Sequence, residues 1–293
     1  MSVKLLLRLN RRVRPTLHPF NAEISGGESY GMWEYRRGGA TVSLYSPEFD
    51  GTEMFFGKDV LDVGCGEGGK SLCYASLGAK SVVGVDTVKE YKEKSDALAN
   101  ALGFSNYTFV CASALALPFD GESFDTVIMS DFFEHVSDPL GALYEAMRVL
   151  RPGGRLFINF PPYYHPYGAH LSDAINIPWV HLFFREKTLI AAYKTLIADK
   201  SDAKRRLKLK ITTDERGAEH IGYINKMTLK KARRIIKESG LAPKMKKYVP
   251  LRKFLAPAAH IPVLREFFVK AAVYVFEKPA EASKKEEFTS RNI

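Results

Sequence analysis

A glycine-rich turn contains the first residues of this chain that could bind a ligand. It follows the short apolar run from Val60 to Val63, and glycines stand at Gly64, Gly66 and Gly69. Glycine lets a backbone approach a ligand closely and adopt dihedral angles that other residues avoid. A helix that begins just beyond the turn favours a negative group at its N-terminus. The spacing alone also fits the Gly-x-Gly-x-x-Gly pattern that binds nicotinamide dinucleotides.

Two carboxylates help to decide whether the turn binds a nicotinamide dinucleotide or a different cofactor. Asp62 lies two residues before the first glycine, where its charge would repel a pyrophosphate but attract an ammonium group through a charge-assisted hydrogen bond. Asp86 ends the next expected strand and can accept hydrogen bonds from both hydroxyls of a ribose. Asp86 suits either ligand, so it is Asp62 that favours a cofactor with an amino-acid part.

Three histidines are candidates for removing a proton from a substrate. His135 follows the fourth expected strand, at the edge where ligands bind in open α/β sheets. An imidazole titrates near neutral pH, as a general base should. The alternative role for His135 is structural, as a cap for the next helix. His165 and His170 are the next candidates, and they lie in a long segment that follows the fifth strand.

Aromatic and polar residues of this long segment could form a substrate pocket. Small-molecule sites combine apolar or aromatic walls with a few polar groups. The alternative is that these side chains pack the segment onto the core. The spacing of His165, His170 and Asp173 matches no metal-binding motif, so we predict no metal site. The candidate substrate contacts are Tyr163, Tyr164, Tyr167, Asp173, Trp179 and His181.

Alternating strands and helices must position these groups. From Lys58 the sequence predicts strands at 60–63, 81–85, 107–111, 124–129 and 155–160, with helices between them. Asp138 and Pro139 are typical of a helix start, and Gly103 of a helix end. A further helix at 228–239 and a last strand at 269–276 follow. Such alternation predicts a mostly parallel sheet covered by helices on both faces, a doubly wound α/β fold.

The chain divides into five expected segments. An N-terminal extension, 1–57, could be helical and contribute to a cap. The ligand-binding core covers 58–160, an inserted cap covers 161–226, and the helix and strands of 227–278 complete the core. Residues 279–293 form a polar tail.

Charge is distributed unevenly along the chain. Residues 194–253 hold 19 Lys and Arg against 6 Asp and Glu, although the net charge of all 293 residues is +10. This stretch is either a solvated surface or a site for nucleic acid or another anion. Residues 3–14 place basic and leucine side chains on opposite faces of a helix, which suits contact with a membrane surface, a targeting segment or packing on the core. Three cysteines fit no disulfide or zinc pattern and indicate a reduced, cytoplasmic protein.

Six segments in this order resemble the class I methyltransferases, in particular the methyltransferase type 11 group. They are 60–68, 85–86, 114–119, 124–127, 134–136 and 150–156. The resemblance covers roughly residues 58–160 and implies a seven-stranded Rossmann-like sheet with S-adenosylmethionine as cofactor. Ser113 stands where the family usually has an aspartate that receives the adenine amino group. The residues implied to contact the cofactor are Asp62, Gly64, Cys65, Gly66, Gly68, Asp86, Thr87, Ser113, Ala114 and Ser130.

The sequence therefore predicts a methyltransferase that acts on a small molecule at oxygen. Two other functions stay open at this point. The chain could methylate RNA through the basic 194–253 stretch, although this stretch contains no recognisable RNA-binding module. It could also bind S-adenosylmethionine without turnover. The acceptor and the oligomeric state do not follow from the sequence.

Overall fold

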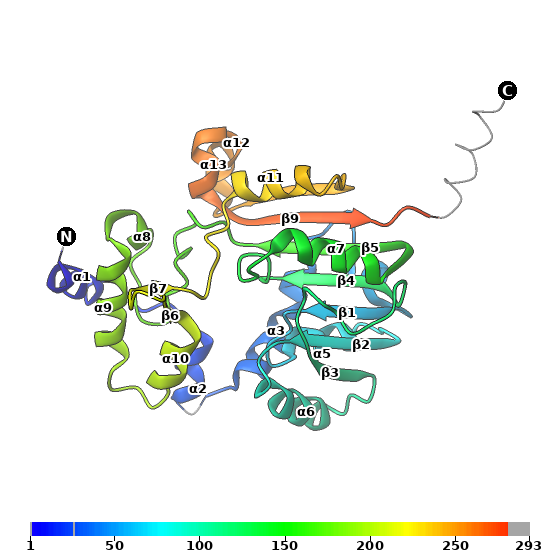
Figure 1. The fold of residues 1–293 in the computed structure, drawn as a ribbon, viewed down its shortest axis with the longest axis horizontal. Helices are drawn as coiled ribbons and strands as arrows, with labels where there is room; N and C mark the ends of the chain where they lie inside the picture. The colour runs from blue at the N-terminus through cyan, green and yellow to red at the C-terminus, as the bar shows by residue number, and fades with distance from the viewer. Residues whose placement is uncertain (1, 26, 281–293) are drawn as a thin grey trace.

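A seven-stranded sheet forms the centre of the protein in the computed structural model, which describes residues 2–25 and 27–280. The strand order is β3-β2-β1-β4-β5-β9-β8 (Figure 1). The first five strands are parallel to one another, and β9 is antiparallel to both β5 and β8. The strands are β1 (Asp59–Val63), β2 (Ser81–Asp86), β3 (Tyr107–Cys111), β4 (Phe124–Ser130), β5 (Leu150–Phe160), β8 (Met245–Pro250) and β9 (Val269–Glu277).

Helices cover both faces of this sheet because its strands are apolar on both sides. On one face, Leu61 and Val127 pack into a core with α7 (Pro139–Val149) and α11 (Leu229–Glu238). On the other face, Val60 and neighbouring side chains meet helices from the first half of the chain. These are α3 (Tyr30–Val42), α4 (Gly51–Phe55), α5 (Gly69–Ser76) and α6 (Tyr91–Leu102). The doubly wound α/β architecture predicted from the sequence is confirmed.

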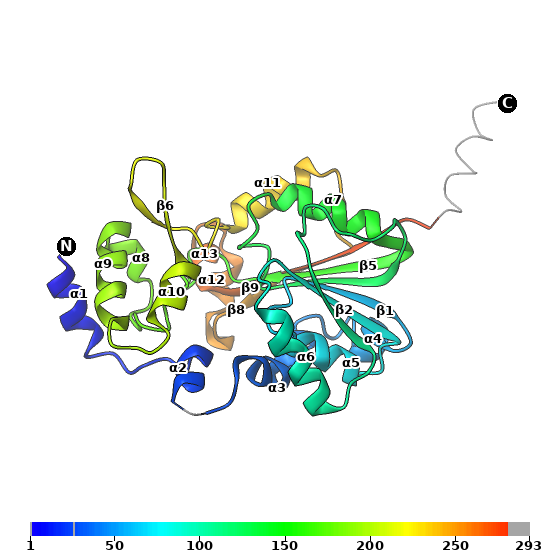
Figure 2. The same cartoon turned by 60° about the horizontal axis from the view of Figure 1, so that its bottom comes forward.

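A second body of helices, here called the cap, lies beyond the carboxyl ends of the parallel strands (Figures 1 and 2). Its apolar cluster unites Leu6 with side chains between Ala169 and Ile224. Polar contacts tie the same segments together: Asn10 Nδ2 donates to Ala174 O at 2.9 Å, and Asn176 N donates to Asn10 Oδ1 at 2.7 Å. The cap elements are α1 (Val3–Asn10), α2 (Pro19–Ile24), α8 (Val180–Phe183), α9 (Glu186–Ile197), α10 (Ala203–Lys210), β6 (Ile211–Thr213) and β7 (Glu219–Ile221).

The amphipathic helix at the start of the chain packs within the cap. Leu6 of α1 is fully buried and α1 contacts α9, whereas Leu5 and Leu9 are partly exposed. Of the alternatives considered for residues 3–14, the structure thus has the helix packed on the rest of the protein. Contact of this helix with a membrane surface stays a prediction. No helix within 2–25 and 27–280 has both the length and the hydrophobicity needed to span a bilayer.

Short helices follow β8 and lie next to α11. They are η1 (Lys253–Leu255), α12 (Ala256–His260) and α13 (Pro262–Phe268). The polar tail predicted for 279–293 falls outside the described residues from 281 onward.

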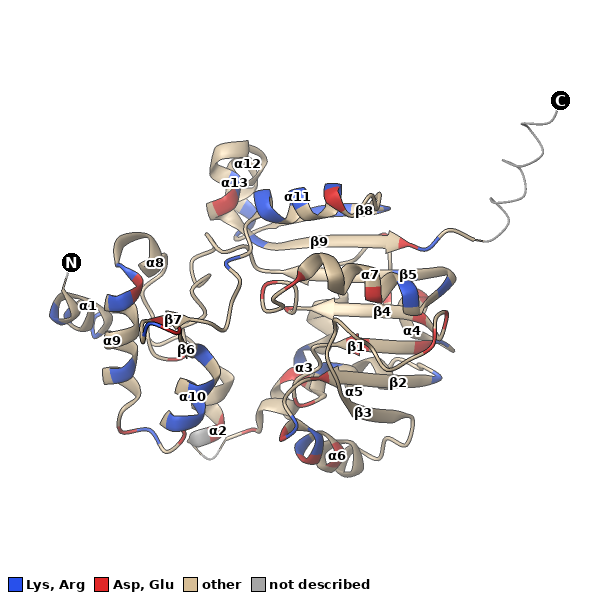
Figure 3. Cartoon of the chain, viewed as in Figure 1, with Lys and Arg blue, Asp and Glu red and all other residues tan. Residues whose placement is uncertain are grey.

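The basic stretch 194–253 does not form one surface. Ten of its 19 lysines and arginines lie on α10 in the cap and on α11 over the sheet (Figure 3), and the other nine lie on α9, β8, η1 and the connecting segments. Two of them, Arg206 and Lys210, are buried. The basic residues that are close in the sequence therefore form several separate surfaces and a buried ion-pair network.

Candidate active site

The turn after β1 has the backbone conformation that its glycines allow. Gly64, Gly66 and Gly68 adopt φ angles of 78°, 56° and 78°, in the left-handed region that other residues rarely enter. A Cβ atom on Gly64 would also lie 2.3 Å from the ring of Phe132. The turn is anchored to β2, because Gly64 N donates to Val85 O at 2.8 Å. The glycines therefore place bare backbone at the edge of the sheet.

Asp86 is oriented by this turn. Its two carboxylate oxygens each accept a backbone hydrogen bond, from Gly66 N and Val88 N, both at 3.0 Å. Burial raises the pKa of Asp86, and these hydrogen bonds oppose the rise. The carboxylate is thus fixed beside the turn with lone pairs still available to a ligand.

Asp62 lies deeper, at the end of β1. Only 2% of the residue is exposed, and its Oδ2 accepts from Ser71 Oγ at 2.6 Å. Burial raises the pKa of Asp62 to about 6, against the opposing effects of Ser71 and Lys70. A buried carboxylate without a direct ion pair suits a cationic ligand group.

One cavity of about 710 Å³ joins this edge of the sheet to the cap. We call its two parts the sheet end and the cap end. The sheet end contains the turn, Asp62 and Asp86, together with Ser113 and Ser130. The cap end is lined by His18, Phe20, His135, His165, Tyr167, His170, Lys210 and Tyr223.

Histidines at the cap end are close to one another and to Glu134. The rings of His135 and His170 lie 4.9 Å apart, and His135 Nε2 lies 3.6 Å from Glu134 Oε1. Burial lowers the pKa of His135 and of His170, and it lowers that of His165 to about 4. Burial raises the pKa of Glu134. At neutral pH these imidazoles are uncharged, and they are weaker bases than an exposed histidine.

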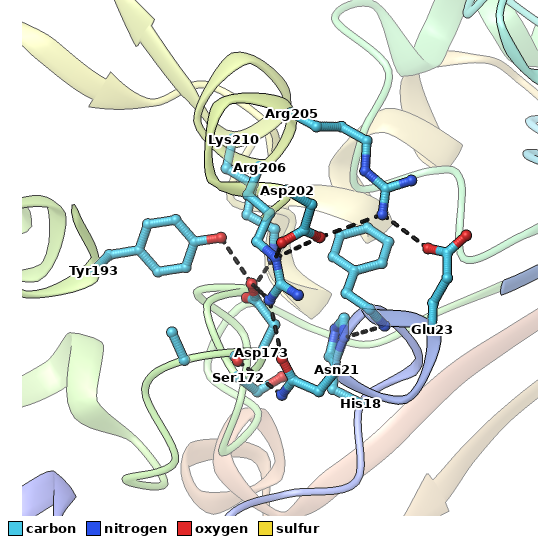
Figure 4. Close-up of polar contacts among 12 residues, drawn as sticks. His18, Asn21, Glu23, Ser172, Asp173, Tyr193, Asp202, Arg205, Arg206 and Lys210 are labelled. Carbon is cyan, nitrogen blue, oxygen red and sulfur yellow. Dashed lines mark hydrogen bonds and ion pairs between the residues drawn. The ribbon is translucent and has the colours of Figure 1, made fainter. Parts of the chain in front are cut away.

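An ion-pair network fixes the cap side of the cavity (Figure 4). Asp173, fully buried at its side chain, accepts from Arg206 Nη1 at 2.8 Å, Lys210 Nζ at 2.7 Å and Tyr193 Oη at 2.7 Å. Burial alone would raise the pKa of Asp173, but the charge and hydrogen bonds of Lys210 and Tyr193 hold it at about 2. Arg206 also pairs with Asp202 at 2.9 Å. The network holds Lys210 where it lines the cavity.

Most of the predicted cofactor and catalytic residues come together at this cavity. Nine of the ten predicted cofactor contacts line it, as do His135, His165 and His170. The exception is Gly68, which starts α5 and faces Ser95 and Tyr107 instead. Ser113, in the position of the family's aspartate, accepts from Leu115 N at 3.2 Å.

The predicted substrate contacts are distributed differently. Tyr167 lines the cavity, but the other five are not among its lining residues. Asp173 holds the ion-pair network, and Trp179 Nε1 donates to Tyr164 O at 3.1 Å. His181 packs against Tyr163 with 4.9 Å between their rings. These side chains serve as internal packing and hydrogen bonds of the cap, the alternative considered from the sequence.

Several cavity residues were not identified from the sequence. Tyr30 and Trp33 come from α3, and Lys70 comes from α5, where it pairs with Asp131 at 2.7 Å and Glu34 at 3.2 Å. Lys210 and Tyr223 come from the cap. No local motif marks Tyr30, Trp33 or Tyr223. Lys70 follows the glycine turn directly, and Lys210 lies four residues after Arg206 on one helix.

The sheet end fits S-adenosylmethionine, the cofactor that the resemblance implies. Asp62 is a buried carboxylate for an ammonium, and Asp86 is held by backbone donors where it can accept from ribose hydroxyls. Gly64 and Gly66 line the cavity with backbone alone, so the cofactor's chain can lie against the turn. Ser113 and Ala114 would border the adenine.

Comparison with known sequences identifies the same part of the chain. Residues 61–158 match the sequence model of a methyltransferase domain. An uncharacterized methyltransferase of Bacillus subtilis, YcgJ, is 32% identical over 117 residues, which are 40% of this chain and 45% of the relative. A ubiquinone biosynthesis O-methyltransferase of Parvibaculum lavamentivorans is 38% identical over 99 residues, 33% of this chain and 38% of the relative. The chain thus matches less than half the length of these curated relatives.

Solved structures share the fold over most of the chain. The cyclase SpnF aligns with a TM-score of 0.54 at 18% identity, covering 89% of this chain and 92% of its own. YcgJ aligns with a TM-score of 0.50 at 17% identity, covering 84% of this chain and 99% of its own. At such identities the likeness shows the fold and not the reaction. The matched sequence shows that residues 61–158 form a methyltransferase domain, and the strand order shows that the fold around them is that of class I methyltransferases, which implies S-adenosylmethionine as the cofactor.

Proposed function

We propose that this protein transfers a methyl group from S-adenosylmethionine to an oxygen atom of a small molecule. The observation that carries the proposal is the single cavity of about 710 Å³ that joins the cofactor end of the sheet to the cap. Pockets for one small ligand typically occupy about 300–1,000 Å³. This volume suits a cofactor and a compact acceptor held together, and it does not suit a folded nucleic acid.

The chain's contribution is to position and desolvate the two reactants. When bound, S-adenosylmethionine supplies a methyl group already activated by its sulfonium, so the acceptor oxygen has only to lose its proton and be aligned with the methyl carbon. Asp62 and Asp86 would orient the donor from the sheet end. The acceptor would lie among Tyr167, His170 and Tyr223, with its hydroxyl toward Glu134 and His135. Alignment of this kind can provide several kcal/mol of a reaction barrier, about 7–11 in favourable cases.

The competing functions have less support from the geometry. The basic residues of 194–253 are distributed over α9, α10, α11, β8 and the connecting segments, and Arg206 and Lys210 are buried. This distribution gives little support to binding of an RNA backbone along one surface. Binding without turnover stays open, and the experiment below separates it from catalysis.

The test is formation of S-adenosylhomocysteine. The full chain would be incubated with S-adenosylmethionine and panels of phenols, catechols and small carboxylic acids, with folded RNA in parallel. We expect product with at least one small hydroxylated acceptor and a shift of its mass by one methyl group. Methylation of RNA alone would contradict the proposal, as would cofactor binding without product over all panels.

A first prediction concerns the pH dependence of cofactor binding. Because the pKa of Asp62 is about 6, its carboxylate is charged above that pH and can pair with the cofactor's ammonium; below it the charge is lost. We expect affinity for S-adenosylhomocysteine to fall about tenfold between pH 7 and pH 5. Isothermal titration at several pH values measures this.

The matched variant is Asp62→Asn. It should bind more weakly at pH 7.5 and show a shallower pH dependence, since the carboxylate that contacts the cofactor's ammonium no longer titrates. An affinity of the parent protein that stays constant from pH 8 to pH 5 would contradict the assigned contact.

A further inference from the structure

Glu134 is a buried carboxyl group without a partner. Its side chain is 3% exposed, it lines the cavity, and neither carboxylate oxygen has a hydrogen-bond partner among residues 2–25 and 27–280. Leaving such a group unsatisfied costs free energy, typically about 1–3 kcal/mol and more for a charge. The two lysines that line the cavity are already paired, Lys70 with Asp131 and Lys210 with Asp173. A ligand that supplies positive charge would satisfy this carboxyl group.

His135 presents a free nitrogen to the same space. Its Nδ1 lies 2.6 Å from Tyr223 O. A carbonyl oxygen can only accept, so Nδ1 carries the proton and the lone pair of the neutral ring is on Nε2. Nε2 is the atom 3.6 Å from Glu134 Oε1. Metal-binding histidines commonly have this arrangement, with the second ring nitrogen donating to a backbone carbonyl.

His170 completes a set of three donors. One ligating atom from each of Glu134, His135 and His170 lies within 4.8 Å of the other two. Donors bound to one zinc at about 2.1 Å lie about 3.4 Å apart in a tetrahedron, so side-chain movements of about 1 Å would close the site. The backbone of His170 is held on both sides: its N donates to Tyr167 O at 2.9 Å, and its O accepts from Lys210 Nζ at 2.6 Å.

We propose that Glu134, His135 and His170 bind a divalent transition-metal ion at the cap end of the cavity. Two imidazoles and one carboxylate form the donor set of catalytic zinc sites and of open non-haem iron sites. These three residues leave a coordination position open toward the cavity. This proposal departs from the prediction of no metal, which weighed His165, His170 and Asp173 and did not consider Glu134 and His135 together with His170.

The ion would deepen the proposed function, and this part of the inference rests on that function. An acceptor hydroxyl at the open position would have its pKa lowered, as water bound to zinc does. The proton would pass to solvent, and the oxygen would remain oriented toward the methyl group. His135 and His170 would then act as ligands and not as bases, which accords with their buried, uncharged state.

The experiment uses Co²⁺ as the probe, on the full chain after dialysis against a chelator. Neither cofactor nor acceptor is added, so the result does not depend on methyl transfer. We expect one Co²⁺ per chain, with visible absorption bands of low-coordinate cobalt. Glu134→Gln and His170→Ala should each lower the affinity at least tenfold. His220→Ala is the matched control, because His220 pairs with Asp214 on the exposed β6–β7 hairpin and should leave the affinity unchanged.

Melting temperatures show whether a variant fails to bind Co²⁺ because it is misfolded or because it lacks a metal ligand. In chelator, Glu134→Gln should melt at or above the parent temperature, because it removes an unsatisfied carboxyl. Co²⁺ should raise the melting temperature of the parent and not of this variant. Absence of saturable Co²⁺ binding would overturn the proposal, as would binding that survives both substitutions or is lost in His220→Ala. If Co²⁺ binding fails while product still forms with a small acceptor, the metal site is wrong and the proposed function stands.

Discussion

Replacing Asp173 with alanine should destabilise the cap by about 3–5 kcal/mol, the cost of breaking a buried ion pair from one side. The substitution would leave Arg206 and Lys210 inside the protein without the anion they share. Their side chains are 0% and 3% exposed, so solvent compensates only in part for the lost carboxylate. Because Lys210 also donates to His170 O, the cap end of the cavity should loosen as well. Urea denaturation and hydrogen exchange of residues 169–224 measure the effect.

Two further variants make this prediction specific. Tyr193→Phe removes one hydrogen bond to the same carboxylate. It should lower the free energy of unfolding by less than Asp173→Ala does, about 1.5–3 kcal/mol. Adding Lys210→Met to Asp173→Ala should recover part of the loss, since it removes one of the stranded cations. If Asp173→Ala lowered the free energy of unfolding by less than about 1 kcal/mol and left hydrogen exchange unchanged, the ion-pair network would not be what stabilises the cap.

Asp86→Ala should weaken cofactor binding by about 1.5–3 kcal/mol, or roughly 10- to 150-fold in the dissociation constant, the range for hydrogen bonds to a charged group. Two effects combine in this variant. The cofactor loses its ribose acceptor, and the backbone donors of Gly66 and Val88 lose the carboxylate that orients the glycine turn. Titration with S-adenosylmethionine and S-adenosylhomocysteine measures the change.

The control for Asp86→Ala is Asp96→Ala. Asp96 lies on the exposed face of α6, pairs with Lys92 at 2.7 Å and is absent from the cavity lining. It should leave cofactor affinity unchanged while altering net charge by the same amount. Equal affinities for the parent and Asp86→Ala would mean that the ribose is bound elsewhere.

The parts of the fold that were predicted correctly depend on local patterns. The strands at 107–111 and 269–276 are confirmed, with one added residue at the end of the second. Asp138 accepts from Leu140 N and Gly141 N at the start of α7, and Gly103 ends α6 with a φ of 76°. Strands were predicted within 227–278, but none was placed at the residues of β8. This strand lies at the edge of the sheet and contains Lys246, Lys247 and Pro250, residues that suit an edge and weaken an alternating apolar pattern.

Residues of the site could be predicted where the residues that indicate them lie close together in the sequence. Asp62, the glycines and Asp86 belong to consecutive elements of the sheet, so their meeting followed from the parallel topology. The cap end depends on contacts between distant segments, such as Asp173 with Arg206 and Lys210. A signal for that network existed: Arg206 and Lys210 are four residues apart and share one face of a helix. What the sequence could not show was that this face is buried around a carboxylate.

The attachment of the first helix to a late part of the chain has a consequence for synthesis. Asn10 is bound to Ala174 and Asn176, and Leu6 belongs to an apolar cluster that extends to Ile224. A ribosome that adds about 5–20 residues per second needs roughly 10–40 s after Asn10 before these partners have been made. Through that interval the leucines of α1 have no docking surface, and nearby Arg8, Arg11, Arg12 and Arg14 give the nascent segment a like charge that discourages association between chains.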